Sequence, residues 1–310
     1  MNVLTRRLAL LVLTTATLTA CGGGDDPHPV NIVETAQADA RFSILVEAVT
    51  AADLGATLSA PGPLTVFAPT DTAFAALLTE LGVTKAQLLA DKALLRTVLS
   101  YHVLSSKVEK AAVPLGRAVT TAQGGIFKID AVASDLVITD GRNRTAKILQ
   151  ADVQASNGVI HAIDKVLLPA NRSIVDTAVA NPDFSILVEA VTAADLVGTL
   201  NSSGPFTVFA PTNAAFAALL NELGVTKAQL LANKALLTKV LTYHVLPSRV
   251  LKAEVPLNTA IATVQGDSLS IDAGLSITDQ RARKSSIVAT DVLASNGVIH
   301  VIDKVILPRP

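Results

Sequence analysis

Two histidine–aspartate pairs have the residue types and the spacing that could support chemistry. His161 precedes Asp164 by three residues within ASNGVIHAIDKVLLP, and His300 precedes Asp303 in the same way within ASNGVIHVIDKVILP. Imidazole and carboxylate groups are common zinc ligands, and the same two groups often act as general acids and bases. The repeated segment therefore forms either a metal or catalytic site or a structural motif.

The predicted backbone of this segment separates the two side chains of each pair. The apolar residues around His161 predict a strand, and side chains along a strand alternate between its faces. His161 then shares a face with Val159 and Ile163, whereas Asp164 points to the opposite face about 10 Å further along the chain. Zinc ligand atoms lie about 2 Å from the metal, so one ion does not fit both groups. We therefore favour a half-buried histidine bonded to backbone, with the aspartate near the strand end.

The chain contains one long internal repeat. FSILVEAVTAADL occurs at residues 42–54 and again, unchanged, at residues 184–196, an offset of 142. The offset falls to 139 by the histidine–aspartate segments, so the second copy lacks three residues near 274–279. A period of this length is the size of a domain rather than of a solenoid repeat. We predict two tandem domains, at residues 30–169 and 170–310.

Helices are expected first in each copy. Apolar residues at the helical spacing i, i+3, i+4, i+7 begin at Phe42 and again at Phe74. Thr70 or Asp71 is the predicted N-cap of the second of these helices, and Gly82 its C-terminal stop. Short β-branched segments then predict strands. Helices followed by strands indicate an α+β fold with antiparallel pairing.

Each copy closes with an asparagine–glycine pair, which begins at Asn157 in the first and at Asn296 in the second. This dipeptide between two apolar segments is a strong signal for a two-residue hairpin. We interpret these asparagines, and the histidine and aspartate that follow each of them, as structural motif residues.

The N-terminus carries a targeting signal. Residues 1–20 combine two arginines with an apolar stretch that is short for a membrane span, as in a signal peptide. The sequence Leu-Thr-Ala-Cys ends at Cys21, the only cysteine, and resembles the box at which bacterial lipoproteins are cleaved and lipidated. Residues 21–29 would be a lipidated, flexible tether. The resemblance to lipoprotein sorting signals implies that Gly22, after the cysteine, favours the outer membrane of a Gram-negative cell. The alternative is an ordinary signal peptide with an incidental cysteine.

Composition excludes several functional classes. Aromatic residues make up 3 % of the chain, tryptophan is absent and the net charge is −1, so nothing indicates a nucleic-acid partner. The sequence lacks a P-loop, a GxSxG elbow, a dinucleotide-binding glycine motif and a zinc-protease motif. We expect no enzymatic activity, no cofactor and no resident metal.

Three ordered motifs resemble those of fasciclin-like domains. They are TVFAPTDTAFAAL, the Tyr101-His102 pair and NGVIHAIDKVLLP, and the second copy repeats them with Tyr243 and His244. The resemblance covers nearly the whole chain after residue 30. It implies tandem modules that each form a β-wedge with flanking helices. It also implies a surface-anchored or extracellular location and a role in adhesion, without catalysis.

Two groups of residues are candidate adhesive contacts. The resemblance implies a link between adhesion and the Tyr-His pairs, although a tyrosine and a histidine on apolar helical stripes are more often buried and hydrogen-bonded. A loop between strands also carries two arginines in each copy, and arginine forks suit acidic polysaccharide or anionic protein surfaces. The alternative is a solvated turn whose arginines pair with nearby acids. The candidates are Tyr101, His102, Tyr243, His244, Arg142, Arg144, Arg281 and Arg283.

We therefore predict a lipid-anchored, non-enzymatic adhesion or binding protein of the cell envelope, with a protein or polysaccharide partner and the membrane contacted through Cys21. Two alternatives stay open. A periplasmic module for a small apolar ligand would need an apolar cavity. An envelope scaffold would hold one particular protein.

Overall fold

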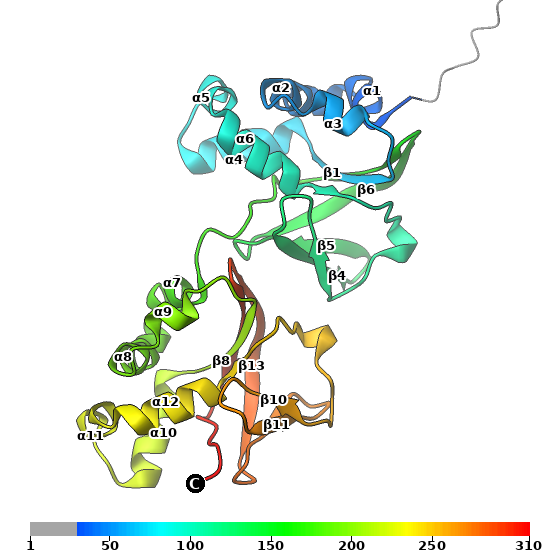
Figure 1. Cartoon of the computed structure of the whole chain (residues 1–310). Coiled ribbons are helices and arrows are strands. Elements are labelled where there is room, and N and C mark those ends of the chain that lie inside the picture. The colour runs from blue at the N-terminus through cyan, green and yellow to red at the C-terminus, as the bar shows by residue number, and fades with distance from the viewer. Residues whose placement is uncertain (1–29) are drawn as a thin grey trace, which may run out of the picture.

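The computed structural model of the chain describes residues 30–310 (Figure 1). The predicted signal peptide, Cys21 and the tether lie outside the described residues. Two copies of one architecture follow each other along the chain, and in each a group of short helices covers one face of a seven-stranded sheet. Within residues 30–310, no helix has the length and apolarity needed to cross a membrane.

Domain 1 begins with helices and ends with strands, as predicted. Its α-helices and 3₁₀ turns are α1 (Ile32–Gln37), η1 (Ala40–Phe42), α2 (Ser43–Ala51), α3 (Gly55–Ser59), α4 (Asp71–Leu81), α5 (Lys85–Ala90), α6 (Lys92–Tyr101) and η2 (Lys110–Ala112). Its strands are β1 (Leu64–Pro69), β2 (Val103–Leu104), β3 (Ala118–Thr120), β4 (Ile126–Val132), β5 (Asp135–Thr139), β6 (Thr145–Ala155) and β7 (Gly158–Ile163).

Domain 2 repeats these elements in the same order. Its helices and 3₁₀ turns are α7 (Ile174–Val179), η3 (Pro182–Phe184), α8 (Ser185–Ala193), α9 (Val197–Leu200), α10 (Asn213–Leu223), α11 (Lys227–Ala232), α12 (Lys234–Tyr243) and η4 (Lys252–Glu254). Its strands are β8 (Phe206–Pro211), β9 (Val245–Leu246), β10 (Ile261–Ala262), β11 (Ser268–Ile271), β12 (Ser276–Thr278), β13 (Lys284–Ala294) and β14 (Gly297–Ile302). The three missing residues shorten the β11–β12 hairpin relative to β4–β5.

The sheet of domain 1 has the order β2-β1-β7-β6-β5-β4-β3, and domain 2 has the equivalent order. All neighbouring strands are antiparallel except β1 and β7, which run parallel with Leu64 opposite Gly158. The predicted antiparallel pairing is therefore confirmed for the other neighbouring strands and wrong for this pair. A parallel pair needs a long crossover connection, and residues 70–157 supply it.

Side-chain caps set the limits of the predicted helices. The Thr70 hydroxyl accepts a hydrogen bond from the Ala73 amide at 3.3 Å, so Thr70 rather than Asp71 caps α4. Asp71 instead accepts from the Ile44 amide at 2.8 Å and from the Ser43 hydroxyl at 2.6 Å at the start of α2. Gly82 ends α4 with a φ of 65°, a left-handed conformation that favours glycine.

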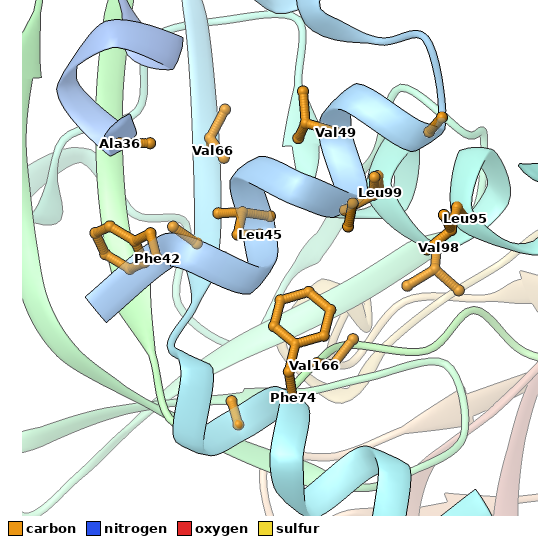
Figure 2. Close-up of a cluster of buried hydrophobic side chains, with 14 of the residues drawn as sticks. Ala36, Phe42, Leu45, Val49, Val66, Phe74, Leu95, Val98, Leu99 and Val166 are labelled. Atoms are coloured by element: carbon orange, nitrogen blue, oxygen red, sulfur yellow. The ribbon is translucent and has the colours of Figure 1, made fainter. Parts of the chain in front are cut away.

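Each sheet has an apolar core on both faces. On one face of domain 1 the helices bury a cluster that Figure 2 shows, in which Phe42 of η1 and Leu45 of α2 lie near Val66 of β1. Phe74 of α4 lies beside Val166 in the same cluster. On the other face, the outer strands fold over a second cluster that includes Phe67, Tyr101, Phe127, Ile129, Ile138 and Ile163. The sheet is thus the shared wall of two cores, and the central strand β7 is buried along its whole length.

Candidate functional site

The buried His161 ring joins two backbone segments. Nε2 donates to the Val108 carbonyl at 2.8 Å, and Nδ1 accepts from the Asp152 amide at 3.2 Å. Asp152 lies in a bulge of β6 with a φ of 60°, where the ladder with β7 shifts register. The histidine therefore accepts a hydrogen bond from the Asp152 amide, which the bulge removes from the strand ladder. Both ring nitrogens form hydrogen bonds. The side chain is fully buried rather than half-buried.

Asp164 acts elsewhere, as strand alternation predicted. Its Oδ1 accepts from the Lys147 amide at 2.7 Å, next to the end of β7. Copy two repeats both arrangements: His300 contacts the Val250 carbonyl at 2.9 Å and the Asp291 amide at 3.3 Å, and Asp303 accepts from the Ser286 amide at 2.7 Å. Within residues 30–310, no group of three or more His, Cys, Asp or Glu side chains is placed to hold a metal ion.

The Tyr-His pair of domain 1 lies inside the domain. His102 donates from Nδ1 to the Val98 carbonyl at 2.7 Å and accepts at Nε2 from the Leu167 amide at 2.9 Å. The Tyr101 hydroxyl donates to the Ile126 carbonyl and accepts from the Gly141 amide at 2.8 Å. Burial lowers the pKa of His102 to about 4 and raises the pKa of Tyr101.

Domain 2 buries its pair in the same way. His244 bonds to the Val240 carbonyl at 2.8 Å and to the Ile306 amide at 3.2 Å, while Tyr243 donates to the Ser268 carbonyl at 2.8 Å. Burial lowers the pKa of His244 to about 4. All four side chains are at most 2 % exposed. Buried groups cannot touch a partner, so the structure corrects the expectation that Tyr101, His102, Tyr243 and His244 are direct adhesive contacts.

Asn157 holds the N-terminal helices against the closing hairpin. Its Oδ1 accepts from the Ile32 amide at 2.9 Å, and its Nδ2 donates to the Leu58 and Ala60 carbonyls at 2.8 and 2.9 Å. Asn296 makes the equivalent bonds to residues 174, 200 and 202. The predicted hairpin is present, but its two turn residues are 156 and 157. Gly158 begins β7, where an added Cβ would lie 2.0 Å from the Leu64 carbonyl oxygen.

The arginine loop of domain 1 is organised by a buried aspartate that the sequence analysis did not single out. The Asp140 carboxylate accepts from the amides of Arg142 and Arg144 at 2.9 Å and from the Leu168 amide at 3.0 Å. Arg144 also bonds to Asp140 through Nε at 3.0 Å and to Glu80 at 2.8 Å. The repeated Thr-Asp before each loop is the sequence signal that could have identified this carboxylate.

Two of the four loop arginines are held by acidic side chains. Arg283 pairs with Glu222 at 2.8 Å and lies beside the buried Asp279, as Arg144 does in domain 1. Arg281 donates from Nε to the Pro308 carbonyl at 3.0 Å, and Arg142 is half-buried. Arg144 and Arg283 join their loops to α4 and α10, which agrees, for these two side chains, with the alternative of arginines paired with nearby acids.

The two domains contact each other through different faces. Figure 1 shows the β4–β5 end of domain 1 next to the β13–β14 hairpin of domain 2. Lys128 of β4 pairs at 2.9 Å with Asp291, whose side chain is 2 % exposed. Asn143 exchanges two hydrogen bonds with the backbone of Leu293, at 2.7 and 3.0 Å. Between these polar contacts lies an apolar cluster of Ala118, Ile126, Leu251, Leu293 and Val298.

Several docking residues are present only in the copy that uses them. The positions of domain 2 that correspond to Ile126, Lys128 and Asn143 are Ser268, Ser270 and Ala282. The positions of domain 1 that correspond to Leu251 and Leu293 are Glu109 and Gln154. In domain 1 those two side chains are exposed and both bond to Lys107. The sequence analysis missed this interface, and its signal was the set of positions at which the copies differ.

Comparison with known proteins agrees with these motifs. The Fasciclin domain family model matches residues 40–169 and 182–308. Protein sll1483 of Synechocystis is 48 % identical over 139 residues, which cover 44 % of this chain and 73 % of that protein. The rabbit transforming growth factor-beta-induced protein ig-h3 is 31 % identical over 252 residues, which cover 81 % of this chain and 35 % of that protein.

More distant similarity extends to human periostin, which is 26 % identical over 260 residues and of which the chain spans 28 %. Among solved structures, a FAS1 domain pair from the insect cell adhesion molecule fasciclin I covers 86 % of this chain and 92 % of the insect chain, with a TM-score of 0.44 and 20 % identity. With both copies matched by the family model, this chain belongs to the fasciclin-domain family and carries two tandem domains.

Proposed function

We propose that this protein is a non-enzymatic adhesion protein of the cell envelope, anchored by lipid on Cys21 in the outer membrane of a Gram-negative cell. The family membership carries the adhesive role, because fasciclin domains occur in cell-adhesion proteins. The Leu-Thr-Ala-Cys box supports the anchor. A surface protein is the partner that we favour over polysaccharide, since Arg144 and Arg283, two of the four arginines suited to acidic sugars, are paired with glutamates.

Exposed apolar residues at equivalent positions of both copies support a protein partner. Leu149 on β6 is 56 % exposed, and its counterpart Val288 on β13 is 59 % exposed. Leu81 and Leu223 form a second such pair at the ends of α4 and α10. One exposed apolar side chain needs no explanation, but its recurrence at the same place in both domains would give a partner two equivalent contacts and raise avidity.

Affinity capture from envelope extracts with the purified protein tests the adhesive role. We expect Leu149→Asp to weaken capture, Val288→Asp to do the same, and the double variant to weaken it by more than the product of the two effects. Val132→Asp is the matched control, because Val132 is 54 % exposed in the part of the β4–β5 hairpin that is shortened in copy two. Equal capture by the wild type and the double variant would contradict the proposal that Leu149 and Val288 contact the partner.

Cell fractionation tests the anchor separately. Cys21→Ser should release the protein from the membrane fraction, and membrane retention of this variant would contradict lipid anchoring. The scaffold alternative predicts capture of one reproducible envelope protein, whereas the adhesive role predicts binding to the surface of neighbouring cells.

A further inference from the structure

Domain 2 contains an apolar cavity between its first helices and its sheet. The cavity has a volume of about 190 Å³, and α7, α8, α9, β8 and β14 contribute to its wall. The equivalent cavity of domain 1 has only about 30 Å³. A dry protein cavity of about 150 Å³ accepts benzene, so the cavity of domain 2 is large enough for a small hydrocarbon group and that of domain 1 is not.

The residue types of the two cavity walls differ at two positions at the rim. Each of the 14 residues that line the domain 1 cavity has an identical counterpart in the wall of domain 2. Domain 2 adds Thr192, whose counterpart in domain 1 is also a threonine, and it adds Val179 and Val197, where domain 1 has Gln37 and Gly55. A Cβ at Gly55 would have no neighbour within 4 Å, so a side chain there extends the wall without displacing other groups. Val179 is 62 % exposed, which makes the rim itself apolar.

The wall offers no polar anchor to a ligand. Its two polar side chains are His244, whose nitrogens bond to the Val240 carbonyl and the Ile306 amide, and Thr192, whose hydroxyl donates to the Val188 carbonyl at 2.8 Å. A charged or hydrogen-bonding group placed inside would be desolvated without compensation. The inserted part of a ligand must therefore be uncharged and apolar, with any polar group left in solvent at the rim.

We propose that the cavity of domain 2 binds the aliphatic end of an amphiphile such as a fatty acyl chain, with one site per protein chain. The site is separate from the adhesive contacts proposed above. Dissolved amphiphiles and membrane lipids both present an aliphatic acyl chain. They differ because the acyl chain of a membrane lipid must first leave the bilayer.

Isothermal titration of the full chain carrying Cys21→Ser with sodium octanoate tests the proposal, because this variant has no covalent lipid to compete. We expect saturable binding with a stoichiometry of one. Val179→Gln with Val197→Gly installs the residues of domain 1 and should weaken binding at least tenfold. Gln37→Val with Gly55→Val in domain 1 should raise the stoichiometry toward two. These exchanges use residues that the other copy already carries, so a folded protein is expected in each case.

Absence of saturable binding would overturn the proposal, as would unchanged affinity in the Val179→Gln, Val197→Gly variant. Phosphatidylcholine vesicles containing a pyrene-labelled lipid distinguish the two sources. Transfer of label to wild type but not to that variant would identify membrane lipid as the ligand, and octanoate binding without transfer would identify dissolved amphiphiles. Partner capture should be unaffected by the rim exchanges, which separates this site from the adhesive one.

Discussion

The two domains share most of their buried residues and differ at their docking faces. The residues that satisfy buried backbone groups, among them Asn157, His161 and Asp140, recur in domain 2 with the same partners. The docking faces and the cavity rim are among the places where the copies diverge. The shared residues are thus the requirements of the fold, and the differing residues mark what each copy does within the pair.

Two equivalent aspartates differ in exposure because only one of them lies in the contact between the domains. Asp152 and Asp291 occupy the same bulge with φ values of 60° and 61°. The side chain of Asp152 is 38 % exposed, whereas that of Asp291 is 2 % exposed because domain 1 covers it and supplies Lys128. The same residue is therefore a surface group in one copy and half of a buried ion pair in the other.

The largest expected effect should be equal in the two copies. Gly158→Ala would place a Cβ 2.0 Å from the Leu64 carbonyl oxygen, and Gly297→Ala would place one 2.1 Å from that of Phe206. Both strands are held on two sides, so each change should cost at least about 3 kcal/mol. Urea unfolding followed by circular dichroism measures the loss. An unchanged free energy of unfolding in either alanine variant would contradict the equivalence of the two buried strands.

Acid should also affect both copies alike. His102 and His244 have a pKa of about 4 in the folded domains against 6.5 when exposed. Between pH 4 and pH 6.5 the unfolded chain therefore binds more protons than the folded chain. The free energy of unfolding decreases as the pH falls from 6.5 to 4. The loss amounts to about 3 kcal/mol per domain. His102→Gln and His244→Gln should each flatten this pH dependence, and an unchanged slope would contradict the assignment.

Exchanging one docking residue should have a smaller effect on stability, and this effect should differ between the two domains. Leu293→Gln puts the residue of domain 1 into the docking face of domain 2, and loss of this buried side chain should cost about 2 kcal/mol. The reverse change, Gln154→Leu at an exposed site, should alter stability by no more than about 0.5 kcal/mol. Differential scanning calorimetry of both variants tests the asymmetry. Similar costs for the two changes would show that Leu293 does not depend on domain 1.

The smallest effect concerns the ion pair between the domains. A double-mutant cycle of Lys128→Ser and Asp291→Asn should give a coupling energy of about 1 kcal/mol, because both side chains are mostly buried. The same cycle with Asp152→Asn should give a value near zero. Equal coupling for the two aspartates would contradict the contact.

Residue patterns within one copy of the sequence predicted many of the helices and strands, but they did not predict how the two domains contact each other. Helical spacing located α2 and α4, and strand alternation placed His161 and Asp164 in separate environments. The parallel β1–β7 pair escaped prediction because periodicity does not report strand order. The role of Asp140 and the burial of the Tyr-His pairs depend on contacts between residues far apart in the chain. Domain docking was visible only as substitutions between copies, such as Lys128 against Ser270, which are uninformative until the two faces are known.

The central claim is that residues unique to each copy hold the two domains in one arrangement. Residual dipolar couplings measured on wild type and on the triple variant Ile126→Ser, Lys128→Ser, Asn143→Ala test it most directly, since the variant gives domain 1 the residues of domain 2. The account predicts one alignment tensor for both domains of wild type and two different tensors in the variant, with each domain still folded. A single shared tensor in the variant, or two in wild type, would contradict it.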